Sequence, residues 1–314
     1  MVIVIILARA LKVNPDNVAT PIAASLGDVT TLSLLAWIAD ILFRHLELKM
    51  FTAQIIIGCY FLILPVFLYM AWSNPHTVEV LQTGWTPVLM AMLISSGGGL
   101  ILDHAVEMFK GITVFAPVMN GAGGNLVAIQ ASRMTTYLHA ATNSLQGTFP
   151  PDDDRVCVLP CSALCGGFSC CGSNQAAPHA GTARLLLCIL VPGQLVFVYS
   201  ICVLEAGVLP TPLFLLGYII ASVAQVVLLL YLCQLLVYWM WSRGADPDNA
   251  AIPYLTAIGD LLGTGFLTIA FLLLHFGGDP TIQNLDVHRI MNETVVEFLN
   301  HTSFSVNLVA TLDT

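Results

Sequence analysis

Two aspartates, Asp28 and Asp260, are the residues of this sequence best suited to bind a cation. Each lies in a long apolar stretch and ends a copy of one motif: Pro-Asp-Asn, a second proline and Gly-Asp, at identical spacing. A carboxylate deep in a membrane-spanning helix costs at least about 2.5 kcal/mol, so it usually has a function, often in an ion path. Mg²⁺ binds through one or two carboxylates and keeps several waters. The pair predicts a divalent-cation site; the structural alternative is an aspartate bonded to a neighbouring helix.

Polar residues near the aspartates offer further oxygen ligands. Ser25 and Thr256 each precede an aspartate by about one helical turn and so share its helix face. Residues 120–125 form a glycine-rich element, which in an apolar run indicates close helix packing or irregular backbone along a water-filled path. The predicted residues of the ion path are Asp28, Asp260, Asn125, Gly124, Thr256 and Ser25.

The polar turn that opens each motif could attract ions to the mouth of this path. The mouth candidates are Asp16, Asn17, Asp248 and Asn249. A structural interpretation is equally supported, because Pro-Asp-Asn is also ordinary in turns and at helix N-caps.

The composition predicts an all-α, polytopic integral membrane protein. Of the 314 residues, 57% are hydrophobic and only 9% are charged, whereas soluble domains have about 25% charged residues. Several stretches of about 18 residues have no charge, as spanning helices require. The net charge of −9 excludes a nucleic-acid-binding surface, which needs a basic face. No nucleophile elbow, zinc-protease helix or dinucleotide motif indicates an enzyme.

The predicted spans form one complete and one partial copy of a five-helix repeat. The complete copy has spans at 85–109, 111–142, 185–206, 213–241 and 250–276. The chain then divides into the end of a first repeat (1–49), a linker helix and connection (50–84), a complete second repeat (85–276) with a hydrophilic cysteine-rich loop (143–183), and a polar tail (277–314). The linker helix would keep both motifs on one side of the membrane.

The distribution of charge and of glycosylation sequons predicts the orientation. Lysine and arginine are more frequent on the side of the turn motifs, which places those motifs in the cytoplasm. The tail then lies outside, where Asn292 and Asn300 occupy N-glycosylation sequons. We expect insertion through the secretory pathway and residence in the plasma membrane. The cysteine loop lacks zinc-knuckle spacing and favours a flexible cytoplasmic loop open to palmitoylation.

Residues 14–28, 118–133 and 246–260 resemble solute carrier family 41, the eukaryotic relatives of the bacterial MgtE magnesium transporters. The resemblance covers nearly the whole chain apart from the cysteine loop and the tail. It implies Mg²⁺ transport, with Na⁺-coupled efflux as proposed for family members. MgtE is a homodimer of a five-helix unit with an aspartate of the fifth helix at the ion site. By motif this role falls on Asp28 and Asp260, and the family's Gly-Gly-Asn element matches Gly123, Gly124 and Asn125.

The sequence departs from the family pattern in its first repeat. That repeat has no counterpart of the first three helices or of most of the fourth, so we expect a truncated product, from alternative splicing, of a longer protein. The alternative to transport is a non-transporting form that assembles with a full-length family member and modulates it. The other expected partners are the lipid bilayer and, in a homo-oligomer, further copies of the chain.

Overall fold

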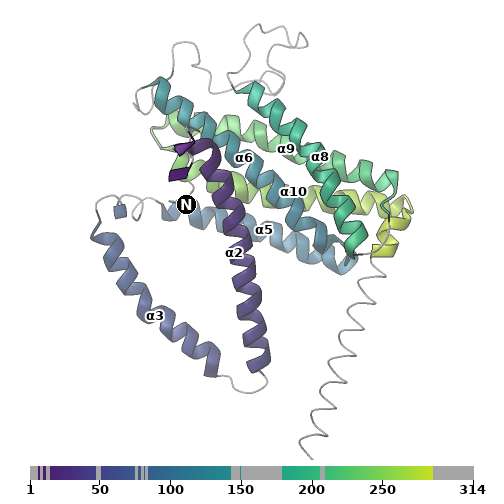
Figure 1. Cartoon of the computed structure of the whole chain (residues 1–314), viewed down its shortest axis with the longest axis horizontal. Coiled ribbons are helices and arrows are strands. Elements are labelled where there is room, and N and C mark those ends of the chain that lie inside the picture. Colours follow the sequence, from purple (N-terminus) through teal and green to yellow (C-terminus); the bar gives the residue numbers. More distant parts are fainter. Residues whose placement is uncertain are drawn as a thin grey trace, which may run out of the picture. The chain divides into compact units, whose positions relative to one another are not determined.

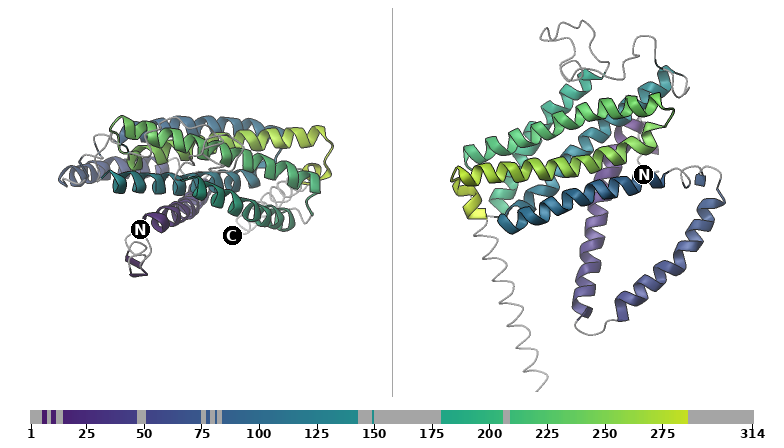
Figure 2. Two further views of the ribbon diagram at one scale, coloured as in Figure 1. Left: turned by 90° about the horizontal axis from the view of Figure 1, so that it is seen from above. Right: turned by 180° about the vertical axis from the view of Figure 1, so that it is seen from behind.

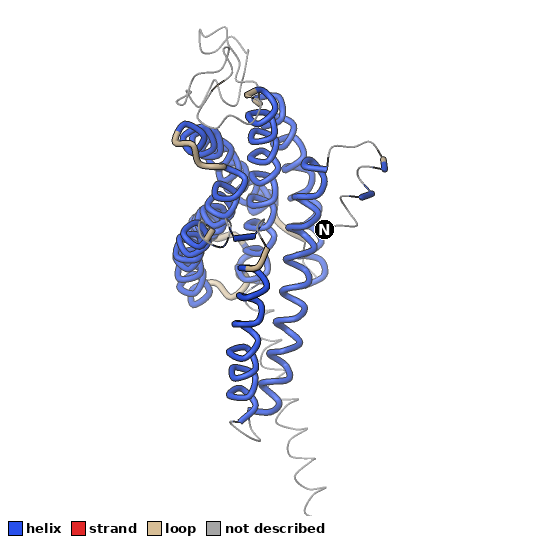
Figure 3. Tube along the Cα trace, turned by 90° about the vertical axis from the view of Figure 1, so that its left-hand side faces the viewer, coloured by secondary structure: helices blue, strands red, loops and turns tan. Residues whose placement is uncertain are grey.

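A computed structural model describes residues 6–7, 10–11, 15–46, 51–74, 77–78, 81, 84–142, 149, 179–205 and 209–285. Within these ranges every regular element is a helix (Figure 3). The long helices are α2 (Pro15–Leu46), α3 (Phe51–Trp72), α5 (Trp85–Met108), α6 (Ile112–Ala141), α8 (Ala180–Glu205), α9 (Pro212–Ser242) and α10 (Pro247–Phe276) (Figure 1). A short helix follows at residues 280–285. The predicted all-α fold is confirmed.

Six helices in the described part of the chain are long and apolar enough to cross a membrane. They are Gln54–Trp72, Trp85–Met108, Ile112–Ala141, Ala180–Leu204, Pro212–Ser242 and Ala250–Phe276. These helices correspond to the predicted linker helix and to the five spans predicted for the second repeat. Helix α2 is not among the six; it carries Asp28 and Asp40. The division into a partial and a complete repeat remains a prediction.

The glycine-rich residues 120–125 lie in the middle of α6, which is a continuous helix from Ile112 to Ala141. The low helix propensity of this stretch suggested irregular backbone as one alternative. That alternative is wrong, and close helix packing is the one that holds. In a bilayer the backbone groups have no water to bond, so a helix that satisfies them internally is favoured even where glycines weaken it.

The described helices belong to two compact units, and α5, α6, α9 and α10 each contribute to both. We call Met1–Leu93, Asn125–Leu159 and Leu232–Thr256 the first unit. The second unit comprises Ile94–Gly124, Pro160–Tyr231 and Ala257–Thr314.

The second unit has a hydrophobic core, rich in aromatic rings, to which five long helices contribute. The Phe115 ring of α6 lies 5.5 Å from that of Phe214, 5.7 Å from that of Tyr218 and 5.8 Å from that of Phe271, centroid to centroid. Such tilted and edge-on pairs stabilise a core beyond the area they bury. Parts of α5, α6, α8, α9 and α10 run alongside one another around this core (Figure 2). The short helix at 280–285 also packs here, through Ile282 and Leu285. The start of the predicted polar tail is therefore part of the fold.

The first unit buries the end of α9 against α6. Trp241 is fully buried, and the His139 ring meets it edge-on at 4.9 Å between centroids. Cys233 of α9 and Met134 of α6 are both buried, with their sulfur atoms 3.9 Å apart. This packing fixes the C-terminal part of α6 next to the turn that follows α9.

The turn between α9 and α10 is defined by a helix C-cap and an N-cap in immediate succession. Gly244 has φ of 71°, its N–H donates to the Trp241 carbonyl, and the Ala245 N–H donates to the Met240 carbonyl. This is the Schellman pattern, in which glycine adopts the left-handed conformation without steric cost. Asp246 then accepts the Asp248 N–H at 3.1 Å through its side chain, which is N-cap geometry.

Candidate functional site

Asp260 lies near the middle of α10 and is half-buried in the second unit. The hydroxyl of Ser95, from α5, donates a hydrogen bond of 3.0 Å to its Oδ2. A hydrogen bond from a hydroxyl group to a carboxylate oxygen fixes the rotamer of the carboxylate. The structure thus presents one oriented intramembrane carboxylate that is bonded to a second helix.

Two glycine contacts bring the neighbouring helices close to Asp260. A Cβ atom on Gly98 of α5 would lie 3.2 Å from Leu261 Cα and 3.3 Å from the Asp260 carbonyl carbon. A Cβ atom on Gly259 would lie 3.6 Å from the Cα of Gly124 on α6. Such close approach of backbones is typical of small residues in membrane bundles. The predicted path residue Gly124 is therefore in contact range of the segment that carries Asp260.

A layer of uncharged polar side chains surrounds the same segment of α10. Asn120 of α6 donates through Nδ2 to Thr264 Oγ1 at 3.1 Å. Gln225 of α9 donates through Nε2 to the Gly259 carbonyl at 3.0 Å. Together with Ser95, these groups give α10 a polar neighbour on each of α5, α6 and α9. Amide and hydroxyl oxygens of this kind, beside a carboxylate, form an environment that suits a hard cation with part of its water shell.

The remaining predicted path residues lie in the first unit. Asp28 and Ser25 are exposed on α2, and the Asn125 side chain donates to the Ser25 hydroxyl at 3.5 Å. Thr256 directs its hydroxyl to the Ile252 and Pro253 carbonyls of its own helix, at 3.1 and 3.0 Å. The structure therefore brings Ser25 and Asn125 together, while the pairing of Asp28 with Asp260 remains a prediction.

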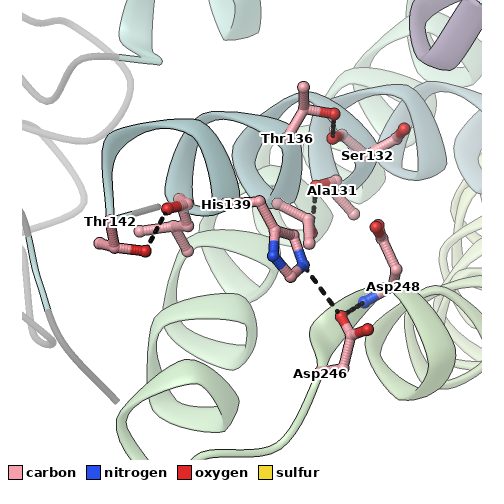
Figure 4. A network of polar contacts seen from close by, with 9 residues as sticks. Ala131, Ser132, Thr136, His139, Thr142, Asp246 and Asp248 are labelled. Atoms are coloured by element: carbon pink, nitrogen blue, oxygen red, sulfur yellow. Dashed lines mark hydrogen bonds and ion pairs between the residues drawn. The ribbon is translucent and has the colours of Figure 1, made fainter. Parts of the chain in front are cut away.

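The second turn motif carries a cluster that could hold a metal ion. His139 Nε2 lies 3.4 Å from Asp246 Oδ1, and Asp248 completes the group (Figure 4). Atoms of these three side chains that could bind a metal all lie within 4.8 Å of one another. Asp246 also acts as the N-cap of α10; the structural interpretation of the motif expected capping, but by Asp248 or Asn249 rather than by the residue before the proline. Of the other mouth candidates, the side chains of Asp16, Asn17 and Asn249 lie outside the described residues, as do the sequons at Asn292 and Asn300.

Sequence reasoning did not identify three polar residues that contact the site or the motif. Ser95 is one of two adjacent serines in its span, Gln225 shares its span with Ser222 and Gln234, and His139 stands near the end of a third span. Their polar character within apolar spans is the available signal, because buried polar groups in membranes find partners on other helices. Their partners are far along the chain, so spacing gave no indication of which residue each would meet.

A profile of the MgtE family, described as a divalent cation transporter, matches residues 116–270. Solute carrier family 41 member 2 of Xenopus laevis is 46% identical over 283 residues, which are 89% of this chain and 48% of that protein. Member 3 of Mus musculus is 44% identical over 276 residues, 87% of this chain and 54% of that protein. Member 2 of Homo sapiens is 44% identical over 283 residues, which are 89% of this chain and 47% of that protein. No solved structure matches the chain.

These similarities extend over most of the chain but only part of each relative. The chain spans about half the length of the curated relatives it matches. The sequence resemblance favours the third member, but the second member matches at 46% identity and the third at 44%, so the family is shown and the member is not. The matched profile includes Asp260, Gly124, Asn125 and the whole of the second turn motif.

Proposed function

We propose that this chain, which belongs to solute carrier family 41, carries divalent cations across a membrane and that Mg²⁺ is its main substrate. The observation that supports this proposal most directly is Asp260, an intramembrane carboxylate oriented by Ser95 at 3.0 Å. A carboxylate in this position lowers the stability of the membrane-inserted helix, so it usually belongs to a site or a path for ions. Its neighbours supply uncharged oxygens, and Mg²⁺ commonly uses one carboxylate with retained waters.

The test is Mg²⁺ flux into proteoliposomes that contain the purified chain. The Asp260→Asn variant keeps the size of the side chain and one acceptor oxygen but removes its charge, so the flux should fall by at least about tenfold, the loss seen even for groups that only support a metal ligand. Asp103→Asn is the matched control, because Asp103 is an exposed carboxylate on α5, and its flux should stay near wild type. Equal flux from the Asp260→Asn variant and the wild type would remove this carboxylate from the mechanism.

The same assay addresses the finer parts of the proposal. We propose that Asp28 contributes to the path together with Asp260, so Asp28→Asn should also reduce flux. We further propose that Na⁺ is the coupling ion, so an imposed Na⁺ gradient should drive Mg²⁺ against its own gradient. Unchanged Mg²⁺ movement under such a gradient would rule out Na⁺ coupling.

A second candidate function is a subunit that assembles with a full-length relative and modulates it. Crosslinking after co-expression with a complete family member tests assembly, and flux by the purified chain alone would count against a purely modulatory role. Plasma-membrane residence and glycosylation at Asn292 and Asn300 remain predictions.

A further inference from the structure

Gln225 is a buried amide that bonds to the helix segment carrying the candidate site. Its side chain is 0% exposed in the middle of α9. Its Nε2 donates to the Gly259 carbonyl at 3.0 Å, and Gly259 directly precedes Asp260 on α10. A directed bond to a carbonyl fixes both the axial position and the rotation of the segment that bears it, which an apolar contact does not.

The amide of Gln225 occupies space that two glycines leave open. A Cβ atom on Gly263 of α10 would lie 2.6 Å from Gln225 Nε2, and one on Gly123 of α6 would lie closer still. Real Cβ atoms do not come so close to another heavy atom. The Gln225 side chain therefore fits between α6 and α10 only because each of these helices has a glycine where it meets the amide.

The polar character of this contact is costly, which argues that it is not simple packing. Gln225 Oε1, Asn120 Oδ1 and Ser222 Oγ are buried without a hydrogen-bond partner among the described residues. Unsatisfied buried polar atoms lower stability, so a leucine of similar volume in place of Gln225 would avoid the cost of burying Gln225 Oε1. The retained amide delivers one thing that leucine cannot, the bond to the Gly259 carbonyl.

We propose that Gln225 is a positioning residue for the ion site. Its amide holds the Gly259–Asp260 segment against α6 and α9, so that the Asp260 carboxylate keeps a fixed direction relative to Ser95. This inference rests on the proposed function. In an α-helix one residue corresponds to about 100° of rotation. A rotation of α10 by a fraction of that angle would turn the Asp260 carboxylate away from Ser95.

The first test compares two buried glutamines of the second unit. Gln194 is 1% exposed and, like Gln225, has one bonded and one unsatisfied amide atom: its Oε1 accepts the Tyr218 hydroxyl at 2.9 Å. Gln225→Leu and Gln194→Leu should both lower the unfolding temperature. Only Gln225→Leu should raise the Mg²⁺ concentration for half-maximal flux, by about tenfold, as loss of a group that orients a metal ligand does.

The second test crowds the amide without removing it. Gly263→Ala places a methyl group against Gln225 Nε2 and Asn120 Oδ1, whereas Gly265→Ala, on the same helix, meets nothing within 4 Å. Gly263→Ala should raise the half-maximal Mg²⁺ concentration as Gln225→Leu does, and Gly265→Ala should not. Because two different substitutions probe one contact, misfolding of one variant leaves the other decisive.

A third measurement separates failure of this inference from failure of the proposed function. Backbone hydrogen exchange of residues 257–266 should become faster in Gln225→Leu than in Gln194→Leu, whether or not the chain transports Mg²⁺. Absence of flux from the wild type would refute the proposed function alone. Equal exchange in the two glutamine variants, or equal half-maximal Mg²⁺ concentrations in a transporting protein, would refute the positioning role.

Discussion

The three consecutive glycines of α5 should respond very differently to the same substitution. A Cβ atom on Gly98 would lie 3.2 Å from both Cα and N of Leu261, which are backbone atoms of α10. A Cβ atom on Gly97 would meet only the flexible end of Leu261, at 3.6 Å, and one on Gly99 meets nothing within 4 Å. Ordinary carbon contacts lie at about 3.5–4.0 Å. Gly98→Ala therefore requires α10 to move away by a few tenths of an ångström, because backbone cannot change rotamer.

Two opposing effects determine how much Gly98→Ala changes the free energy of unfolding. Overpacking by one methyl group in a close-packed region costs about 1–3 kcal/mol. Replacing glycine by alanine within a helix gains about 0.5–1 kcal/mol. Gly98→Ala should therefore be destabilising by up to about 2 kcal/mol, while Gly99→Ala should be neutral or slightly stabilising. The same displacement lengthens the bond between Ser95 Oγ and Asp260 Oδ2 beyond its 3.0 Å, so the half-maximal Mg²⁺ concentration should also rise.

Thermal unfolding in detergent and Mg²⁺ flux in proteoliposomes measure both consequences on the same preparations. The expected order of stability is Gly99→Ala at or above wild type, Gly97→Ala close to wild type and Gly98→Ala lowest. If Gly98→Ala and Gly99→Ala proved equal in stability and in Mg²⁺ dependence, the close approach of α5 and α10 would not be a constraint on the site.

Three further substitutions test two single hydrogen bonds. Ser95→Ala removes the donor to Asp260 and should raise the half-maximal Mg²⁺ concentration by about tenfold; an unchanged value would show that the carboxylate is oriented by other groups. Asp246→Ala removes the N-cap of α10 and should lower the free energy of unfolding by about 1 kcal/mol, whereas Asp246→Asn, an equally good cap, should stay within a few tenths. Equal loss in both Asp246 variants would indicate that the charge facing His139 is what stabilises the turn.

The helices could be predicted, and Asp260 could be singled out as a candidate site residue, because each produces a local signal. Uncharged runs of sufficient length mark spans wherever they occur. Asp260 is conspicuous because a charge in such a run is expensive. That the second turn motif caps a helix follows from the preference of aspartate and asparagine for the N-cap position, although the capping residue is Asp246 and not one of the predicted four. None of these inferences needs knowledge of which helices are neighbours.

The partners of Asp260 could not be predicted, because they depend on how the helices pack. Ser95 and Asp260 are 165 residues apart in the sequence, and nothing in the spacing of either selects the other. Likewise, the glycines at 98, 123 and 263 differ from those at 99, 121 and 265 only in what they face. The continuous helix through residues 120–125 shows the same limit, since its helical propensity alone is poor.

The short turn between α9 and α10 has a mechanical consequence. Only residues 243–246 separate the two helices. Gly244 is in the left-handed conformation, and the Asp246 side chain caps α10. Proline, which has a fixed φ, follows at the first position of α10. A turn this short and restricted has few backbone dihedrals that can change freely. If an ion at Asp260 rotated α10, α9 would therefore rotate with it. We expect α9 and α10 to move together as one rigid body in any hinge or shear motion of the protein.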